Sequence, residues 1–311
     1  FTDALGNAGT AVTSGSGSVS VDNASPTMTI TSSTVSSGDT SNDASIALTF
    51  TSSEATTNFA VADITVTGGT LSNFAASSST VYTATFTASA DGATSINVSA
   101  GAFSDATGNT NTAANQFTWS RDATSPSMTI TGLTTNNGDT SNLSSIVLTF
   151  TSSEATTNFA VGDITVTGGT LSDFDSSSSS VYSATFTPTS DGVTTIDVGA
   201  GTFTDAYGNN NTAASQFVWT YDGTGPTMVI TSTTVSDGAT SNDSSIALTF
   251  TSSEATTNFA KADITVSGGS LSNFSPTSST VYTATFAPSG DGDTTIDVGA
   301  GSFTDAYGNN N

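Results

Sequence analysis

Cysteine and histidine are both absent from the 311-residue chain, and Lys and Arg together number only 2. No disulfide can form, so each folded part must depend on its apolar core and on any metal that it binds. The same absences remove the usual pairs of nucleophile and base, because there is no thiol, no imidazole and only one lysine, Lys261. The composition therefore predicts a protein that is not an enzyme.

Positive charge is nearly absent too. Asp and Glu total 26, which gives a formal net charge of −24, and the only fixed positive charges are Arg121 and Lys261. Such a chain is repelled by nucleic acid and by anionic lipid surfaces, so neither is expected as a partner. No apolar run approaches the length of a membrane span, and no secretory signal opens the sequence, which starts at Phe1 rather than Met. We expect a segment of a longer protein that does not insert into membranes.

The sequence repeats itself at an interval of 100 residues. The interval is marked by Pro26, Pro126 and Pro226, by the word TSSEATTNFA around Glu54, Glu154 and Glu254, and by the word DITV from Asp63, Asp163 and Asp263. The repeats predict domains at 22–121, 122–221 and 222–311, after the tail of an upstream repeat at 1–21. The third domain is expected to lack its final strand, because the words QFTWS and QFVWT that end the other two do not follow it.

Within each repeat, apolar and polar residues alternate in short bursts, which is typical of half-buried strands. The bursts of the first repeat contain Met28 and Ile30; Ile46, Leu48 and Phe50; Ile64 and Val66; Leu71 and Phe74; Tyr82 and Phe86; Ile96 and Val98; and Phe117 and Trp119. Turn residues separate them, including Gly68-Gly69 and Asp91-Gly92. The pattern predicts an all-β chain of tandem seven-stranded Greek-key immunoglobulin-like β-sandwiches arranged as a rod.

The combination of TSSEATTNFAVADITVTGGTLSNF, VYTATF, TTIDVGAGTFTDAYGNN and DATSPSMTI resembles the bacterial immunoglobulin-like (BIg) tandem repeat domains of large secreted or surface adhesins. The resemblance covers essentially the whole chain. It implies stalk domains at the cell surface or outside the cell, often calcium-dependent. Neither a receptor-binding tip nor a secretion signal is visible here, so adhesion itself is implied only by association.

We letter the seven expected strands A to G in chain order. In a sandwich of this connectivity, the entry of the chain, the B–C loop and the F–G loop lie at one pole. Each repeat places four carboxylates there. They are Asp22, Glu54, Asp63 and Asp105; Asp122, Glu154, Asp163 and Asp205; and Asp222, Glu254, Asp263 and Asp305.

Two carboxylates about 4 Å apart repel by about 4 kcal/mol at an effective dielectric constant of about 20. Ca²⁺ binds about six to eight oxygens and relieves such repulsion. The sequence therefore predicts structural Ca²⁺ at the domain junctions, where it would lock the short linkers. The alternative is that the acids are solvated or cap their own loops, which is the default for Asp39, Asp43, Asp91, Asp173, Asp175 and Asp293.

The leading hypothesis is a calcium-stiffened spacer of a bacterial surface adhesin, with about 40 Å per domain and about 120 Å for three in line. Its partners would be the neighbouring repeats of the same chain and, in the alternative, other copies of itself. That alternative is a filament or surface layer in which residues 10–21, TAVTSGSGSVSV, fill the open groove of another copy. A receptor- or glycan-binding module is disfavoured because the three repeats are near-copies. A viral tail fibre would have the same appearance.

Overall fold

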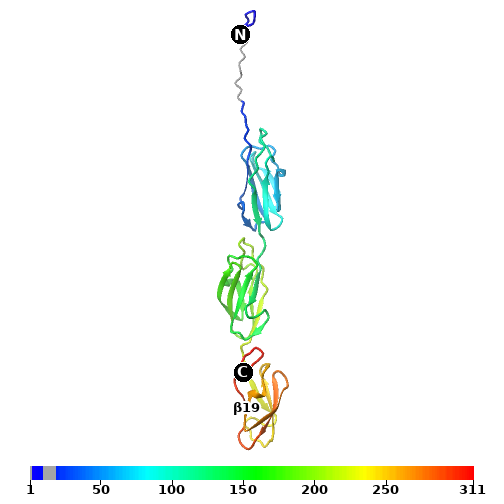
Figure 1. Ribbon diagram of the computed structural model, residues 1–311, viewed down its shortest axis with the longest axis vertical. Coiled ribbons are helices and arrows are strands. Elements are labelled where there is room, and N and C mark those ends of the chain that lie inside the picture. Colours follow the sequence, from blue (N-terminus) through cyan, green and yellow to red (C-terminus); the bar gives the residue numbers. More distant parts are fainter. Residues whose placement is uncertain (1, 10–18) are drawn as a thin grey trace. The chain divides into compact units, whose positions relative to one another are not determined.

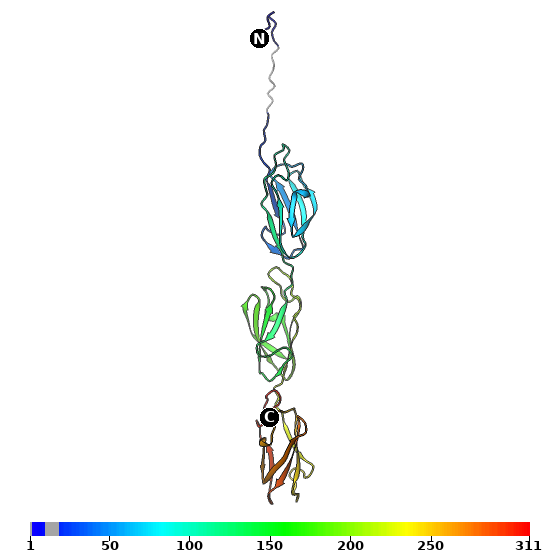
Figure 2. The same cartoon turned by 45° about the vertical axis from the view of Figure 1, so that its right-hand side comes forward.

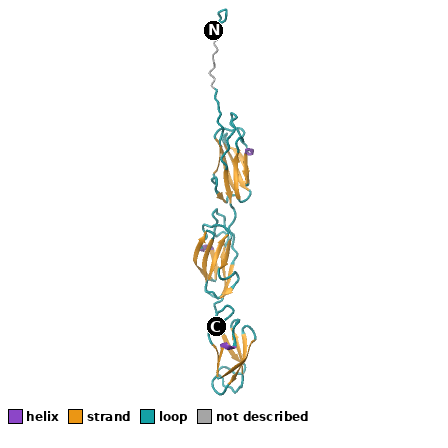
Figure 3. Cartoon of the chain, viewed as in Figure 1, coloured by secondary structure: helices purple, strands orange, loops and turns teal. Residues whose placement is uncertain are grey.

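The computed structural model describes residues 2–9 and 19–311. The chain divides into two compact units, Phe1–Thr124 and Ser125–Asn311. Helix is limited to single 3₁₀ turns, η1 (Val61–Asp63), η2 (Val161–Asp163) and η3 (Lys261–Asp263) (Figure 3). None of these turns, the only helices in the described part of the chain, is long and apolar enough to cross a membrane.

The first repeat is a sandwich of two four-stranded sheets (Figures 1 and 2). One sheet has the order β1 (Met28–Ser32), β3 (Ser45–Ser52), β6 (Val81–Ala88), β5 (Gly69–Ala76). The other has the order β2 (Thr40–Ser41), β8 (Phe117–Arg121), β7 (Gly92–Val98), β4 (Ile64–Thr67). All ladders are antiparallel except β2·β8, which is parallel. The immunoglobulin-like sandwich is thus confirmed, with the short strand β2 in addition to the seven predicted strands.

The second repeat has the same plan. Its sheets are β9 (Met128–Gly132), β11 (Ile146–Ser152), β14 (Val181–Pro188), β13 (Gly169–Ser178), and β10 (Thr140–Ser141), β16 (Phe217–Tyr221), β15 (Gly192–Val198), β12 (Ile164–Thr167). The third repeat has one complete sheet, β17 (Met228–Ser232), β18 (Ile246–Ser252), β21 (Val281–Pro288), β20 (Gly269–Pro276). Its second sheet contains only β19 (Ile264–Ser267) and β22 (Thr295–Val298).

The core of the third repeat is open where β8 and β16 close the other two. Five apolar side chains are half-buried there, although their counterparts in the first and second repeats are buried: Met228, Ile230, Ile246, Ile296 and Val298. Of the segment expected to fill such a groove, residues 10–18 lie outside the described residues. Strand donation between copies therefore stays a prediction.

Aromatic residues close the core beneath the entry pole. The ring of Phe59 packs against Phe50, Phe74, Tyr82 and Phe103, with ring centroids 5.0–5.9 Å apart. Such contacts stabilise a core by about 0.5–1.5 kcal/mol per pair beyond the burial of area. Phe59 is the next-to-last residue of the repeated word TSSEATTNFA, so this packing anchors the loop that also carries Glu54.

The edge strand β5 has two special backbone positions, a close approach to β6 at Gly69 and a bulge at Asn73. A Cβ added at Gly69 would overlap the carbonyl oxygen of Thr87 and the ring of Phe86 on β6. Further along, the register shifts between Ser72 and Ala75, and Asn73 takes a positive φ of 53°. Asp173 and Asn273 repeat this bulge with φ of 51°.

We expect Gly169→Ala, in the second repeat, to lower the free energy of unfolding by about 1–3 kcal/mol, because its Cβ has no room against Phe186 and Thr187. Denaturant unfolding followed by tryptophan fluorescence measures this. Gly162→Ala is the matched control, since nothing lies within 4 Å of its Cβ position and Ala62 and Ala262 stand there in the other repeats. Equal stability of the two variants would contradict the packing explanation.

Candidate metal sites

Three carboxylates meet at the entry of the first repeat. One oxygen from each of Asp22, Glu54 and Asp105 lies within 4.8 Å of the other two. Asp22 precedes β1, Glu54 follows β3, and Asp105 lies between β7 and β8. Asp222, Glu254 and Asp305 form the corresponding group of the third repeat. The second copy is divided between the two units, with Asp122 in the first and Glu154 and Asp205 in the second.

Asp105 is held by its own turn. Its Oδ1 accepts the backbone N–H groups of Thr107, Gly108 and Asn109 at 2.9, 2.7 and 2.9 Å, and its Oδ2 accepts Nδ2–H of Asn109 at 2.9 Å. Gly108 closes the turn with a φ of 97°. Oδ1 of Asp305 likewise accepts the backbone N–H groups of Tyr307 and Asn309, both at 2.8 Å, and its Oδ2 accepts Nδ2–H of Asn309 at 2.7 Å. The word D-x-x-G-N therefore folds as a local carboxylate cap.

This turn also holds the entry segment in place. Nδ2 of Asn109 donates to the carbonyl oxygen of Asp22 at 3.1 Å, and Nδ2 of Asn309 donates to that of Asp222 at 2.9 Å. A neighbouring bond joins the loop after β3 to the same turn, since Ser104 N–H donates to Oδ1 of Asn58 at 3.0 Å. Side-chain amides and backbone groups thus gather the three acids of each group.

Within one group, the pKa values of two acids are shifted in opposite directions. Burial alone would raise the pKa of Asp105, but the hydrogen bonds from Asn109 and Thr107 outweigh it and lower the pKa to about 2. Burial and then the negative charges of Asp22 and Asp105 raise the pKa of Glu54. Burial, Asp222, Asp305 and Asp191 raise that of Glu254. Each group is therefore a concentration of negative charge that its own protein contacts relieve only in part.

No positive side chain compensates this charge among the residues that the structure describes. Their one salt bridge joins Arg121 to Asp91 at 2.9 Å, at the exit of the first repeat. A donor set of carboxylate oxygens without nitrogen or sulfur ligands fits a hard divalent cation such as Ca²⁺. These acidic groups could therefore hold a metal ion.

The fourth predicted ligand of each set lies outside the group. Oδ2 of Asp63 accepts the N–H of Ala60 at 2.8 Å and caps η1, and Asp163 and Asp263 do the same for η2 and η3. Asp39 likewise caps its turn by accepting Ser36 N–H at 2.7 Å. In the first and third repeats the structure thus brings together three of the four acids that we singled out, and their role as metal ligands stays a prediction.

Asp91, which the sequence indicated only as a turn residue, also contacts the linker. Oδ2 of Asp91 accepts the hydroxyl of Thr124 at 2.9 Å. In the second unit, Asp191 accepts Gly223 N–H at 2.7 Å and the hydroxyl of Thr224. These two bonds, with Thr224 the larger cause, lower the pKa of Asp191. The recurrence of D-G at 91 and 191 with D-x-T at 122 and 222 was the available signal.

All three repeats match a model of the bacterial Ig-like domain, at residues 22–120, 122–220 and 222–311. The chain therefore belongs to the bacterial Ig-like domain family and contains three tandem copies, which confirms the resemblance noted in its sequence. A search among curated proteins found no significant match.

Solved structures with similar folds include bacterial adhesins. InvD of Yersinia pseudotuberculosis is 17% identical, with 90% of this chain and 84% of InvD covered and a TM-score of 0.34. Invasin, described as a bacterial integrin-binding protein, is 16% identical, with 88% and 56% covered and a TM-score of 0.35. The adhesin InvE of Y. pseudotuberculosis is 19% identical, with 63% and 58% covered and a TM-score of 0.25. At this level the likenesses carry no argument about function, and this chain spans less than two thirds of invasin and InvE.

The pKa of Asp105, about 2 against an ordinary 3.8, predicts a pH dependence of stability. The unfolded chain takes up this proton first as the pH falls, so the contribution of the carboxylate is fully present above about pH 4 and is lost towards about pH 2. Glu54 acts oppositely, because its cost is present above its raised pKa and is relieved as the pH falls towards 4.5.

Carboxyl ¹³C chemical shifts followed by NMR should show Asp105 titrating well below 3.8, the ordinary pKa value for an aspartate, and Asp105→Asn should flatten the decline of unfolding temperature below pH 4. A titration midpoint of Asp105 close to 3.8 would contradict the hydrogen-bonded cap.

Proposed function

We propose that this chain is a non-catalytic extracellular spacer, a run of stalk repeats from a bacterial surface adhesin or fibre, stiffened by Ca²⁺. The observation that carries the proposal is the convergence of Asp222, Glu254 and Asp305 where one repeat passes into the next. Family membership in three tandem copies supports the structural part of it. Ig-like repeats of this kind are generally non-catalytic, and the absence of Cys and His agrees with that.

The proposed ligands come from both sides of the linker between the second and third repeats. Asp222 directly follows β16 of the second repeat, whereas Glu254 and Asp305 belong to loops of the third. The charge of Asp191, from the loop before β15, also raises the pKa of Glu254. A cation held by these oxygens would connect the two repeats and reduce bending, and its removal would leave mutual repulsion.

The first repeat offers the same group to the segment that precedes it, through Asp22. For the second repeat, calcium binding stays a prediction from Asp122, Glu154 and Asp205. A spacer also explains why near-identical repeats suffice, since distance requires no individual binding surface in each copy. We place the chain outside the cell, at the surface.

A self-assembling filament is the second candidate. The half-buried Met228, Ile230 and Ile296 of the third repeat line the place that β8 or β16 occupies in the other repeats. A strand of another copy would cover them. Sedimentation of the purified chain distinguishes the candidates, because the filament requires concentration-dependent polymers and the spacer requires none.

For the calcium part, we expect excess Ca²⁺ to stabilise the chain by about 2–3 kcal/mol at roughly a hundred times the dissociation constant. Calorimetry should show an upward shift of the unfolding temperature that chelator reverses. Glu254→Gln should lessen the shift of the third repeat and raise its stability in chelator, since the repulsion is relieved. Asp297→Asn, an exposed acid on β22, removes the same charge elsewhere and should keep the full shift. Equal responses of the two variants would exclude the site.

For the spacer itself, small-angle scattering should give a larger and better-defined maximum dimension in Ca²⁺ than in chelator. Antibodies raised against the chain should label intact cells of the source bacterium, and protease treatment of those cells should remove the label. Labelling only after cell lysis would contradict a surface location. Unchanged scattering would contradict calcium stiffening.

A further inference from the structure

The parallel pair β2·β8 joins the beginning of the first repeat to its last strand. Thr40 pairs with Ser120 and Ser41 with Arg121. Flanking backbone bonds extend the contact, from Gly38 N–H to the carbonyl oxygen of Thr118 at 2.8 Å, from Ser120 N–H to that of Asp39 at 3.0 Å, and from Asp122 N–H to that of Ser41 at 3.0 Å. These bonds form one continuous contact, which we name the latch.

The second repeat builds the same latch. Thr140 and Ser141 of β10 pair in parallel with Thr220 and Tyr221 of β16. The three flanking bonds recur at 2.7, 2.9 and 3.1 Å, from Gly138, Thr220 and Asp222 to the carbonyl oxygens of Val218, Asp139 and Ser141. In the third repeat, residues 240–241 form no strand in the described chain, because the strand that would face them is not among its elements.

A side-chain bond reinforces each latch from the core side. The indole N–H of Trp119, whose side chain is buried, donates to Oγ of Ser41 at 3.0 Å, and Trp219 donates to Ser141 at 3.0 Å. A buried indole N–H left without an acceptor is costly, so sliding of β2 along β8 breaks this bond together with the backbone bonds.

The parallel orientation of β2 and β8 determines how the latch responds to tension. A chain pulled at both ends draws the segment containing β1 and β2 towards its own N-terminus and draws β8 towards its own C-terminus. Because β2 and β8 run parallel, these pulls oppose each other along the strands, and the hydrogen bonds are sheared together rather than opened one by one. Tension then passes from the first strands to the last directly, without loading the core between them.

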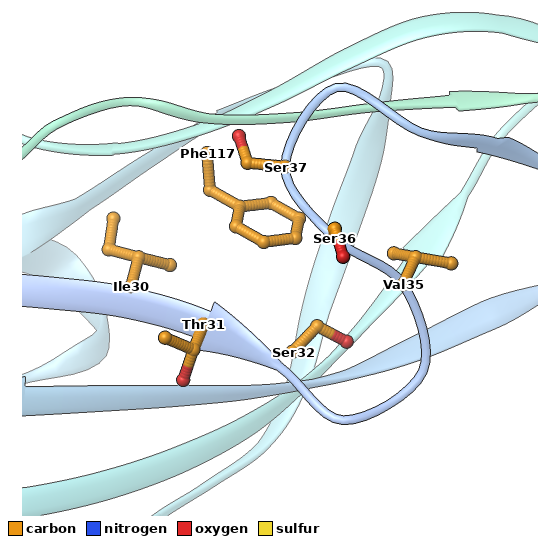
Figure 4. Close-up of a pocket in the computed structure, with 7 residues that line it drawn as sticks. All are labelled: Ile30, Thr31, Ser32, Val35, Ser36, Ser37 and Phe117. Atoms are coloured by element: carbon orange, nitrogen blue, oxygen red, sulfur yellow. The ribbon is translucent and has the colours of Figure 1, made fainter.

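We propose that these latches are the force-bearing elements of the repeats and set the rate at which each repeat unfolds under tension. Their use in the cell rests on the proposed stalk function, but their strength does not. The crossover between β1 and β2 is less suited than the latch to be the force-bearing element of the first repeat. It borders a hollow of about 290 Å³ lined by Ile30, Val35 and Phe117 among others (Figure 4).

In the second repeat the crossover is packed differently. Gly132 and Thr135 replace Ser32 and Val35, and Thr135 is buried with 5% of its surface exposed. Similar latches with dissimilar crossovers allow a comparison within one chain. If the latch governs the mechanical strength, the first and second repeats should unfold at similar force.

The test is single-molecule pulling of the full chain by its ends, in chelator so that no cation contributes. We expect two strong events of similar force, each lengthening the chain by about 300 Å. A third, weaker event should come from the third repeat, whose described residues form no latch. Ser120→Pro with Thr220→Pro removes one latch N–H per repeat, and the residues whose carbonyl oxygens accept these bonds are exposed (Asp39) or half-buried (Asp139). At constant force, the unfolding rate of both repeats should rise about tenfold or more.

The matched control is Val98→Ala with Val198→Ala, which removes buried core volume on β7 and β15 outside the latch. It should lower the unfolding temperature at least as much as the prolines do, yet accelerate unfolding under force less. A second latch variant, Gly38→Ala with Gly138→Ala, strains only the local backbone, because φ is 97° and 89° and nothing lies within 4 Å. This glycine variant should accelerate forced unfolding about threefold. It can replace the proline variant in the test if the prolines prevent folding.

Acceleration by the core variant equal to that by the latch variants would overturn the proposal, as would unchanged rates in both latch variants. Neither result would affect the spacer proposal, which depends on surface labelling and on the response to calcium. Conversely, the chain could show strong latches under force and yet never reach the cell surface. That result would support the latch proposal and contradict the stalk proposal.

Discussion

The loop that begins at Asp105, Asp205 and Asp305 is the constraint on which the candidate sites depend. A carboxylate that collects the N–H groups of its own turn stays ionised while buried. The asparagine that follows then reaches the entry segment in the first and third repeats. Fold and site are therefore coupled, because the same turn that closes the pole of the sandwich also places its charge beside two other acids.

Sequence alone predicted much of the fold for a physical reason. Apolar residues such as Ile46, Leu48 and Phe50 alternate with a period of two, and all three are buried as that pattern requires. Strand β2 was not predicted, because Thr40 and Ser41 carry no apolar signal and their pairing depends only on backbone groups. Gly69 was attributed to turn conformation, whereas the structure requires it for the close approach of β6.

The acids were harder to interpret. Connectivity correctly indicated that Asp22, Glu54 and Asp105 converge, since that follows from which loops share a pole. Connectivity could not distinguish Asp63 from these three acids, although the carboxylate of Asp63 accepts the N–H of Ala60, three residues earlier. It also missed Asp91, because a contact from a turn to Thr124 depends on how the last strand leaves the sandwich. Local hydrogen bonding of Asp competes with every longer-range role that its charge suggests.

The bulge on β5 has a consequence for contacts between neighbouring molecules. Asn73, Asp173 and Asn273 each turn the backbone to positive φ in an edge strand and shift its register. An edge interrupted in this way is a poor template for a strand from a neighbouring molecule. The sheets of neighbouring molecules are therefore kept from merging along this edge.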